Sequence, residues 1–242
     1  MKTIERYWNG MPTIVDYELE DGCMIENTLA HIGTIIIDKD FIDEMERIAL
    51  ELKDDKKLVV LLTNLYNKVK EYFSSNEIND KTRQETYFDN NVVDEDGLIL
   101  GTKISSLKGK NVARCSEKSV AAYIILKKLY SMGAIVRKPS FVLSSLSTEK
   151  YGSGPHAFVM LDKDCDDPTK HLIFDIENPT LIEDEDKKKQ YCVGIYSLKD
   201  EEYNDFLNGL SCSPISLYEI GSDYREISDK RTYGNVTKNK SL

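Results

Sequence analysis

Apolar residues recur with a helical period through much of the first 95 residues. Between residues 40 and 53 they fall three or four positions apart, which places them on one helix face, and Asp40 is available as the N-cap. The same period continues through 56–73 and ends at the polar sequence Ser74-Ser75-Asn76. The pattern therefore predicts that residues 1–95 form a mainly helical N-terminal region.

Two stretches of this region lack the helical period. The β-branched run Thr34-Ile35-Ile36-Ile37 is typical of a short strand or another buried segment. Residues 74–96 contain Asn-Asp, Asp-Asn-Asn and Asp-Glu-Asp-Gly clusters, which favour turns. We therefore expect a loop over 74–96, ahead of a second half with a different pattern.

The second half of the chain predicts one helix followed by an antiparallel sheet. Residues 116–132 carry apolar positions along one side, and Gly133 follows where a left-handed cap is expected. Short apolar runs come next, with hairpin-type turns expected at 153–155 and 162–169, and 200–208 favours a further helix. The strand-like runs are 134–136, 140–143, 157–161, 172–176, 191–196 and 216–220.

These elements predict an α+β fold in three parts. The mainly helical region 1–95 precedes a core over 96–227, in which the helix packs on the antiparallel sheet. Residues 228–242 are polar and contain no apolar cluster, so we expect this tail to fray.

Charge and hydropathy exclude two classes of partner. The chain has 32 Lys and Arg residues against 42 Asp and Glu residues, and the resulting net charge of −10 would repel a phosphate backbone. The longest apolar run, Leu58 to Leu62, is far shorter than the roughly 18 residues that a membrane span needs. We therefore expect neither a nucleic-acid partner nor a membrane span.

The cysteines and the N-terminus point to a reducing compartment. The five cysteines include no Cys-x-x-Cys pair, so they predict neither a disulfide framework nor a zinc ribbon, and no Cys/His cluster has metal-ligand spacing. Residues 1–8 are charged and aromatic and lack the apolar segment of a secretion signal. We expect a cytoplasmic protein without a metal and with at least one free thiol.

Cys115 is the candidate nucleophile, because it stands at the start of the predicted helix 116–132. The free N–H groups and the positive dipole end of a helix N-terminus favour a thiolate, and the same groups could accept the oxyanion of a tetrahedral intermediate. Asn111, four residues earlier, is a further candidate oxyanion donor. Cys23, Cys165, Cys192 and Cys212 have no comparable position and are interpreted as small core or surface residues.

His156 and Asp175 are the candidate partners of this thiol. His156 follows a Gly-Pro turn at the start of the predicted strand 157–161, where we expect it at an end of the sheet. Asp175 is the one acid in the apolar run 172–176, and such a carboxylate needs a partner when it is buried. A hairpin between these strands would place Asp175 beside His156, where it could orient the ring and stabilise the imidazolium.

Other polar residues have a structural explanation available. His31 and His171 are the other two histidines; His31 is interpreted as a hydrogen-bonded core residue and His171 as a strand-end residue, and either is a weaker candidate base. Arg137 could hold a substrate carboxylate or pair with an acid on the sheet, and Glu117 could cap the helix at its N-terminus. The charged run 183–189 is interpreted as a solvated loop.

Residues 109–180 resemble the core of the transglutaminase-like superfamily, in which a papain-like fold carries a Cys-His-Asp triad. The segment Ala113 to Ser119 resembles the start of the family's nucleophile helix, and Tyr130 to Arg137 resembles its Leu-x-x-x-Gly-Ile-x-Ala-Arg passage. His156-Ala157-Phe158-Val159 resembles the His-Ala-Trp-x-Glu strand, and Phe174 to Pro179 the Asp-Pro ending. Phe158 replaces the family's Trp, Met160 replaces a common acidic residue, and three residues separate Asp175 from Pro179.

The resemblance implies thiol-dependent acyl transfer on a peptide or protein amide, with Cys115, His156 and Asp175 as the triad and no cofactor. Hydrolysis, glutamine deamidation and transamidation all remain open, because they differ in whether water or an amine reaches the acyl-enzyme. An arylamine N-acetyltransferase-like enzyme is the chemical alternative, although the chain lacks that family's Arg-Gly-Gly-x-Cys motif. A non-catalytic protein-binding scaffold with the same fold is the alternative from another class.

Overall fold

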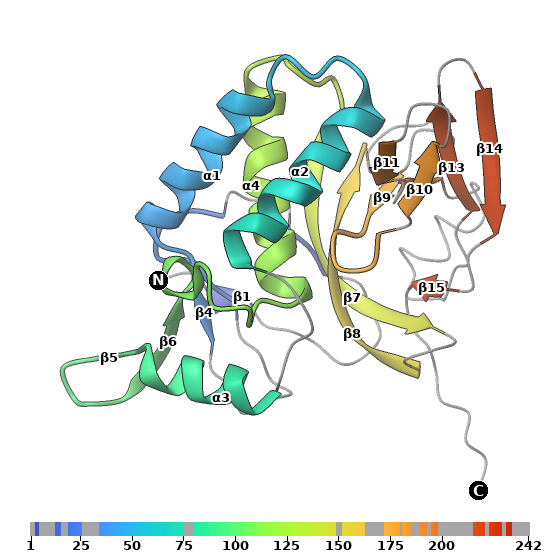
Figure 1. The fold of residues 1–242 in the computed structure, drawn as a ribbon. Helices are drawn as coiled ribbons and strands as arrows, with labels where there is room; N and C mark the ends of the chain where they lie inside the picture. Colours follow the sequence, from blue (N-terminus) through green and yellow to red (C-terminus); the bar gives the residue numbers. More distant parts are fainter. Residues whose placement is uncertain are drawn as a thin grey trace, which may run out of the picture.

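The computed structural model has an α+β fold, in which helices pack on one face of a curved, mainly antiparallel sheet (Figure 1). The structure describes residues 3–4, 13–15, 19–25, 34–74, 80–148, 152–162, 172–179, 181–184, 189–192, 195–197, 215–220, 223–228 and 231–233.

Two helices form where the N-terminal period predicts them. Helix α1 spans Lys39–Leu52 and α2 spans Leu58–Phe73, and Ser74 ends α2 in the left-handed conformation, with φ of 52°. The N-cap of α1 is Asp38 and not Asp40, because Asp38 is still extended after the preceding strand. Its buried carboxylate accepts hydrogen bonds from the backbone N–H groups of Phe41 (3.3 Å) and Ser105 (3.1 Å), which fixes α1 to the segment before the central helix.

The region predicted as a loop over 74–96 contains a third helix, and this part of the prediction is wrong. Helix α3 spans Asp80–Asp89 and leads into strand β5, Asn91–Val93. Its sequence is polar and has no clear apolar face, which is why periodicity misses it. The helix is held instead by two buried side chains, Arg83 and Tyr87.

A five-stranded sheet lies beside α3 and contributes to the N-terminal half. Its strand order is β1-β3-β4-β6-β5, so short strands accompany the three helices of the N-terminal region. Gly101 in β6 has φ of +145°, and a Cβ there would meet the Thr34 carbonyl of the neighbouring chain segment, so only glycine fits. The other strands are β1 (Thr3–Ile4), β3 (Met24–Ile25), β4 (Ile35–Ile36) and β6 (Ile99–Lys103), and β6 continues into the 3-10 helix Ile104–Leu107.

The second half forms the predicted central helix and antiparallel sheet. Helix α4 spans Cys115–Ser131, and Gly133 follows it with φ of +70°. The large sheet has the order β14-β13-β12-β9-β8-β7-β15, and β2 shares the outer edge of β7 with β15. Its strands are β2 (Thr13–Val15), β7 (Pro139–Thr148), β8 (Gly152–Leu161), β9 (Leu172–Phe174), β12 (Ile195–Ser197), β13 (Ile215–Ile220), β14 (Asp223–Ser228) and β15 (Arg231–Tyr233).

Four local predictions for this half need correction. Residues 134–136 form no strand, and Val136 is 91% exposed. Residues 153–155 lie inside β8 and not in a turn, because β7 and β8 stay paired out to Thr148 and Gly152. The ends of the charged run 183–189 pair as the hairpin of β10 (Leu181–Asp184) and β11 (Lys189–Cys192). The tail expected to fray contains β15, while the helix predicted over 200–208 lies outside the described residues.

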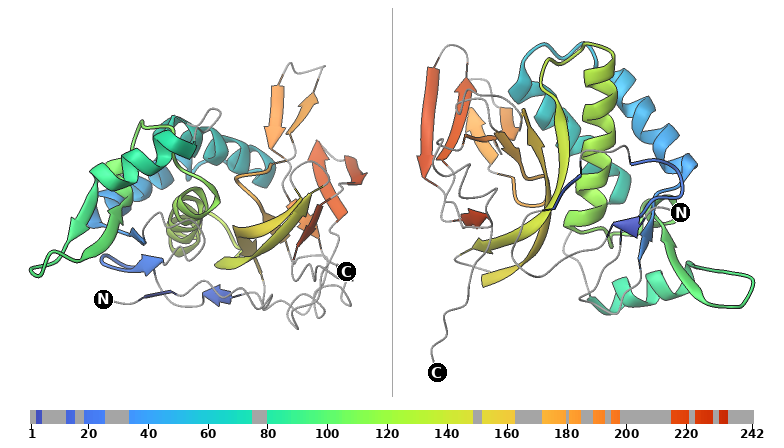
Figure 2. Two further views of the ribbon diagram at one scale, coloured as in Figure 1. Left: turned by 90° about the horizontal axis from the view of Figure 1, so that it is seen from below. Right: turned by 180° about the vertical axis from the view of Figure 1, so that it is seen from behind.

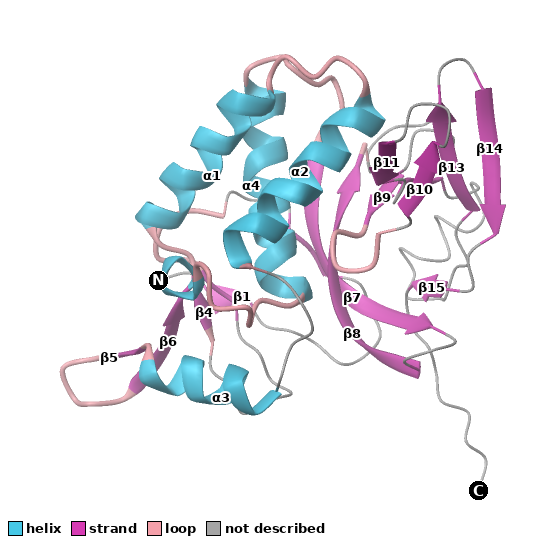
Figure 3. Cartoon of the chain, viewed as in Figure 1, coloured by secondary structure: helices cyan, strands magenta, loops and turns pink. Residues whose placement is uncertain are grey.

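Helix α4 is the centre of the molecule. It contacts α1 and α2 on one side and β7 and β8 on the other, and Figures 1 and 2 show it between these two layers. Its buried residues form one large core with α1, α2 and the facing side of the sheet. A smaller core, which includes Phe158, Met160 and Tyr233, fills the opposite side of the sheet. Figure 3 shows helices α1, α2 and α4 together on one side of β7 and β8. The start of α4 is therefore fixed from several directions.

Candidate active site

Cys115 is the first residue of α4 and is half-buried at the edge of the large core. The segment before it is anchored on the end of α2. Gly109 donates its backbone N–H to the Tyr72 carbonyl and Asn111 donates to the Phe73 carbonyl, both at 2.9 Å. Asn111 is itself in the left-handed conformation, with φ of 55°. These backbone bonds aim the chain so that α4 starts at Cys115.

A buried ion pair closes the first turn of α4. Glu117, which is fully buried, accepts the backbone N–H of Arg114 at 3.0 Å, so it caps the helix as the sequence predicts. The structure adds that Arg83 of α3 donates Nη2–H to Glu117 at 2.6 Å, and that Tyr87 donates its hydroxyl to the same carboxylate. Arg83 also donates to the Val112 carbonyl. Burial opposes ionisation of Glu117, but the Arg83 charge and these hydrogen bonds outweigh it and keep the pKa of Glu117 below its usual value.

His156 lies in the middle of β8, and the expectation that it stands at a sheet end is wrong. It pairs with Ser144 of β7 and is only 4% exposed, because β8 begins four residues before it. The hydroxyl of Ser119 in α4 donates to the Ala157 carbonyl at 2.9 Å, which ties the helix to the strand beside His156. The His156 ring lies against Phe158, with ring centroids 6.1 Å apart.

Asp175 lies beside His156, within the hydrogen-bond reach that the strand pattern predicts. Its Oδ2 is 2.8 Å from His156 Nε2, and the carboxylate is fully buried just after β9. Oδ1 accepts the backbone N–H groups of Glu177 and Asn178, each at 3.1 Å, in the turn that follows. Tyr233 of β15 donates its hydroxyl to Oδ2 at 2.7 Å. Both carboxylate oxygens are thus held by fixed donors, and one of them faces the imidazole.

These contacts set the charges of the pair. Burial opposes a charged imidazole, but the Asp175 charge and hydrogen bond, together with a side-chain hydrogen bond with Cys115, raise the pKa of His156 to about 10. Burial likewise opposes the Asp175 carboxylate, and the His156 charge with the donors around it lowers the pKa of Asp175 to about 2. At neutral pH the structure therefore favours an imidazolium between a carboxylate and the Cys115 sulfur.

The two nitrogens of His156 have different partners. Nε2 faces Asp175, so Nδ1 is the ring nitrogen left for Cys115, whose side chain hydrogen-bonds to His156. Cys115, His156 and Asp175 come from the start of a helix, the middle of a strand and the turn after the next strand. The fold brings the three predicted residues together in the order thiol, imidazole, carboxylate.

Arg137 has a structural partner, and the other candidate histidines and cysteines are buried elsewhere or lie outside the described residues. Arg137 pairs with Asp162 at 2.9 Å on the neighbouring turn, which matches the structural interpretation. His31 and His171 lie outside the described residues, as do the side chains of Cys165, Cys192 and Cys212, while Cys23 is a buried free thiol. The role of Asn111 as an oxyanion donor stays a prediction.

Three residues that sequence reasoning missed hold this site. Tyr233 orients Asp175 from a segment that looked like a polar tail, and Arg83 and Tyr87 hold Glu117 from a segment that looked like a loop. The available signal was weak. Tyr233 is an aromatic residue in polar surroundings, but Tyr87 stands next to Phe88, and residue type alone does not show that Tyr87 is the buried ring of the two.

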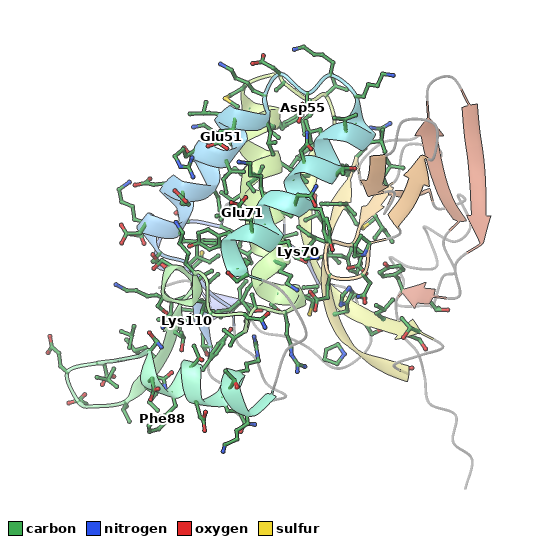
Figure 4. All side chains as sticks on the ribbon, viewed as in Figure 1. Glu51, Asp55, Lys70, Glu71, Phe88 and Lys110 are labelled. Atoms are coloured by element: carbon green, nitrogen blue, oxygen red, sulfur yellow. The ribbon has the colours of Figure 1, made fainter. Side chains whose placement is uncertain are left out.

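A separate pocket of about 390 Å³ lies between α1 and α2. Figure 4 labels three of its acidic side chains, Glu51, Asp55 and Glu71. Lys68 also lines it and pairs with Glu51 at 2.7 Å, so part of the charge is neutralised within the protein. No triad residue lines this pocket, and it is a feature distinct from the candidate active site.

No protein-family model, curated protein or solved structure gives a significant match to this chain. Of the helices that the structure describes, none is long and apolar enough to cross a lipid bilayer. The chemistry of the site is therefore inferred from its own residues.

Tyr233→Phe is expected to lower stability modestly, by about 1–3 kcal/mol, because a charged acceptor loses one donor while the buried ring is kept. The hydroxyl stabilises the ionised form of Asp175, so its loss raises the Asp175 pKa and moves acid unfolding to a higher pH. The stability difference from wild type should be full above about pH 4 and shrink as pH falls toward 2. Thermal melts across this range measure it.

Tyr130→Phe is the matched control, because Tyr130 is 41% exposed at the far end of α4. It should melt like the wild type at every pH. A Tyr233→Phe variant that also melts like the wild type at pH 7 would show that this hydroxyl does not hold Asp175.

Proposed function

We propose that this protein is a cysteine amidase or acyltransferase, in which Cys115, His156 and Asp175 act as a triad within a papain-like, transglutaminase-like core. The observation that carries the proposal is the continuous set of contacts from the Cys115 thiol through the two nitrogens of His156 to the fixed Asp175 carboxylate. Structural cysteines are seldom linked in this way to a buried imidazole whose pKa is raised.

The proposed reaction begins with the thiolate of Cys115, whose proton resides on His156. The sulfur attacks the amide carbonyl carbon, and the carbonyl electrons move to oxygen. When the tetrahedral intermediate collapses, the C–N bond breaks and His156 gives its proton to the departing amine or ammonia. Water or a second amine, deprotonated by His156, then attacks the acyl carbon, the C–S bond breaks, and the departing thiolate restores the ion pair with His156. Asp175 keeps the ring oriented and stabilises its charged form throughout.

The start of α4 supplies the oxyanion donors in this proposal. Cys115 is the first helical residue, so the positive end of the helix dipole lies at this terminus. A carbonyl carbon in contact with the Cys115 sulfur would bring its oxygen near this terminus, where the dipole favours a negative charge. One helix terminus thus favours both the thiolate and the oxyanion.

The proposed substrate is a peptide or protein amide, as the sequence resemblance implies. Hydrolysis, deamidation and transamidation share every step up to the acyl-enzyme, so the triad supports all three equally. No metal or organic cofactor takes part in the proposed cycle.

The rate of Cys115 alkylation as a function of pH tests the proposal. In the proposed ion pair the thiolate forms well below the pKa of about 8.5 of a free cysteine, so iodoacetamide should label Cys115 rapidly at pH 6. A second change in rate is expected near pH 10, where His156 loses its proton. The two inflections belong to the coupled pair. Mass spectrometry of the Cys115 peptide gives the rates, and ammonia release from a glutamine-containing peptide gives turnover.

The non-catalytic scaffold makes the opposite prediction. If Cys115 labels with a single inflection near pH 8.5, no faster than the other cysteines, the ion pair is absent and the scaffold is preferred. Rapid labelling with hydrolysis of amides, and no transfer to an added amine, would narrow the proposal to an amidase.

A further inference from the structure

We infer that Arg83 and Glu117 are positioning residues for Cys115, and that their opposite charges shift the ionisation of its thiol in opposite directions. This inference rests on the proposed function for its catalytic meaning. It starts from the contrast within α3, whose inner side chains are buried against α4 while Phe88 on its outer side is 75% exposed (Figure 4).

The geometry of this ion pair is unusual for a helix cap. Glu117 alone would suffice to cap Arg114 from the first turn of α4. Arg83 and Glu117 are instead 4% and 1% exposed, and their charges meet at 2.6 Å in a site closed by the Tyr87 ring, 4.5 Å from the guanidinium. Removing two charges from water is costly, and a cap does not require it.

The buried pair acts on the two ends of the segment that carries the nucleophile. Arg83 holds the Val112 carbonyl, three residues before Cys115, and Glu117 holds the Arg114 N–H immediately before it. Arg83 and Glu117 also bond to each other, so contacts with α3 connect the two ends of the segment from Val112 to Glu117. This loop of contacts fixes where the Cys115 sulfur lies relative to His156.

The pair carries one charge of each sign: Arg83 interacts electrostatically with Cys115, and Glu117 lies two residues after Cys115 in the first turn of α4. Burial lowers the pKa of Arg83, but the Glu117 charge and smaller contributions raise it and together outweigh burial. The charge of Cys115 is one of the smaller contributions that raise this pKa. By reciprocity Arg83 favours the thiolate, while the carboxylate of Glu117 opposes it. Other charged or titratable groups around this end of α4 include Arg114 at the N-cap, His156, Asp175, the Lys118–Glu177 ion pair and Tyr87.

The test measures the pH dependence of Cys115 alkylation by iodoacetamide in the full-length chain. Arg83→Gln should raise the apparent thiol pKa and Glu117→Gln should lower it, each by about one unit or more, the shift that a close charge produces. The double variant should return near the wild-type value. Lys81→Gln is the matched control, because it removes the same charge from the exposed side of α3 and should leave the pKa unchanged.

A purely structural pair would behave differently. If the pair were purely structural, both single variants would melt at a lower temperature. Their thiol pKa would then be unchanged, or it would move in the same direction in both variants. Either result would overturn the inference. If Arg83→Gln does not fold, Glu117→Gln and the double variant still test the sign, and Arg83→Lys should keep the wild-type pKa because it keeps the charge.

Alkylation separates this inference from the proposed function, because it needs no turnover. Opposite pKa shifts in a chain that releases no ammonia from any amide would uphold the charge relationship and remove the proposed acyl transfer. Turnover by the wild type, with unshifted thiol pKa values in the variants, would uphold the proposed acyl transfer and overturn the charge relationship.

Discussion

Replacing Cys115 by alanine is expected to abolish acyl transfer, with a loss of roughly 10⁴-fold or more to the assay background. No other group in the proposed cycle can form the acyl-enzyme, so His156 and Asp175 cannot compensate. Cys115 is only half-buried at the edge of the core, and we expect the variant to lose no more than about 1 kcal/mol of stability. Turnover assays and thermal melts of the same preparation measure both.

Cys23→Ala provides the control with the opposite profile. Cys23 is a free thiol that is 3% exposed, and truncating it leaves a small cavity that costs about 1–2 kcal/mol. It should therefore melt at a lower temperature and keep full turnover. Undiminished activity in Cys115→Ala, on any substrate that the wild type processes, would remove this thiol from the mechanism.

Asp175→Asn is expected to lower the rate by roughly 10–10⁴-fold, because the amide cannot reproduce the contacts of the carboxylate. Both oxygens of Asp175 accept, Oδ1 from two backbone N–H groups and Oδ2 from His156 and Tyr233. An asparagine has one acceptor oxygen. If that oxygen stays with the backbone, its NH₂ group faces His156 Nε2 and favours the tautomer with the proton on Nδ1. That nitrogen could then no longer accept the Cys115 proton.

The same substitution changes the pH dependence of stability. The pKa of Asp175 is lowered to about 2 in the folded protein, so its ionisation stabilises the fold above about pH 4 and this contribution is lost as pH falls toward 2. Asp175→Asn removes that contribution at neutral pH, and Asp175→Ala should be less stable still because the His156 ring loses its partner. Turnover and stability equal to wild type in Asp175→Asn would remove Asp175 from the triad, whereas the loss of stability alone would leave it a structural role.

Local sequence pattern predicted the elements that are rich in apolar residues. Helices α1 and α2 bury apolar positions on a helical period, whereas α4 is buried on nearly all sides and was predicted from its long apolar sequence and the glycine that follows it. The β-branched and aromatic runs that became β7, β8 and β9 read as strands for the same local reason, and the hairpin pairing of β8 with β9 follows from their order. This was enough to bring His156 and Asp175 together.

Elements that are held by polar contacts could not be predicted from the local sequence pattern. Helix α3 has no apolar face, and the contact that fixes it is an ion pair between residues 34 positions apart, Arg83 and Glu117. Strand β15 buries Tyr233, whose hydrogen-bond partner Asp175 lies 58 positions away. Neither partner can be chosen from the many charged residues of the chain until the fold has brought them together.

The sequence by itself therefore determined the α+β class, the central helix beginning at Cys115 and the candidates His156 and Asp175, because all of these depend on the chemistry of neighbouring residues. Only the tertiary structure decided that His156 is buried in the middle of a strand, that Tyr233 donates a hydrogen bond to Asp175, and that Arg83 contacts the start of α4. Burial and long-range charge pairing exist only once distant segments pack. Their energy depends on the surrounding dielectric and on geometry, and a linear sequence specifies neither.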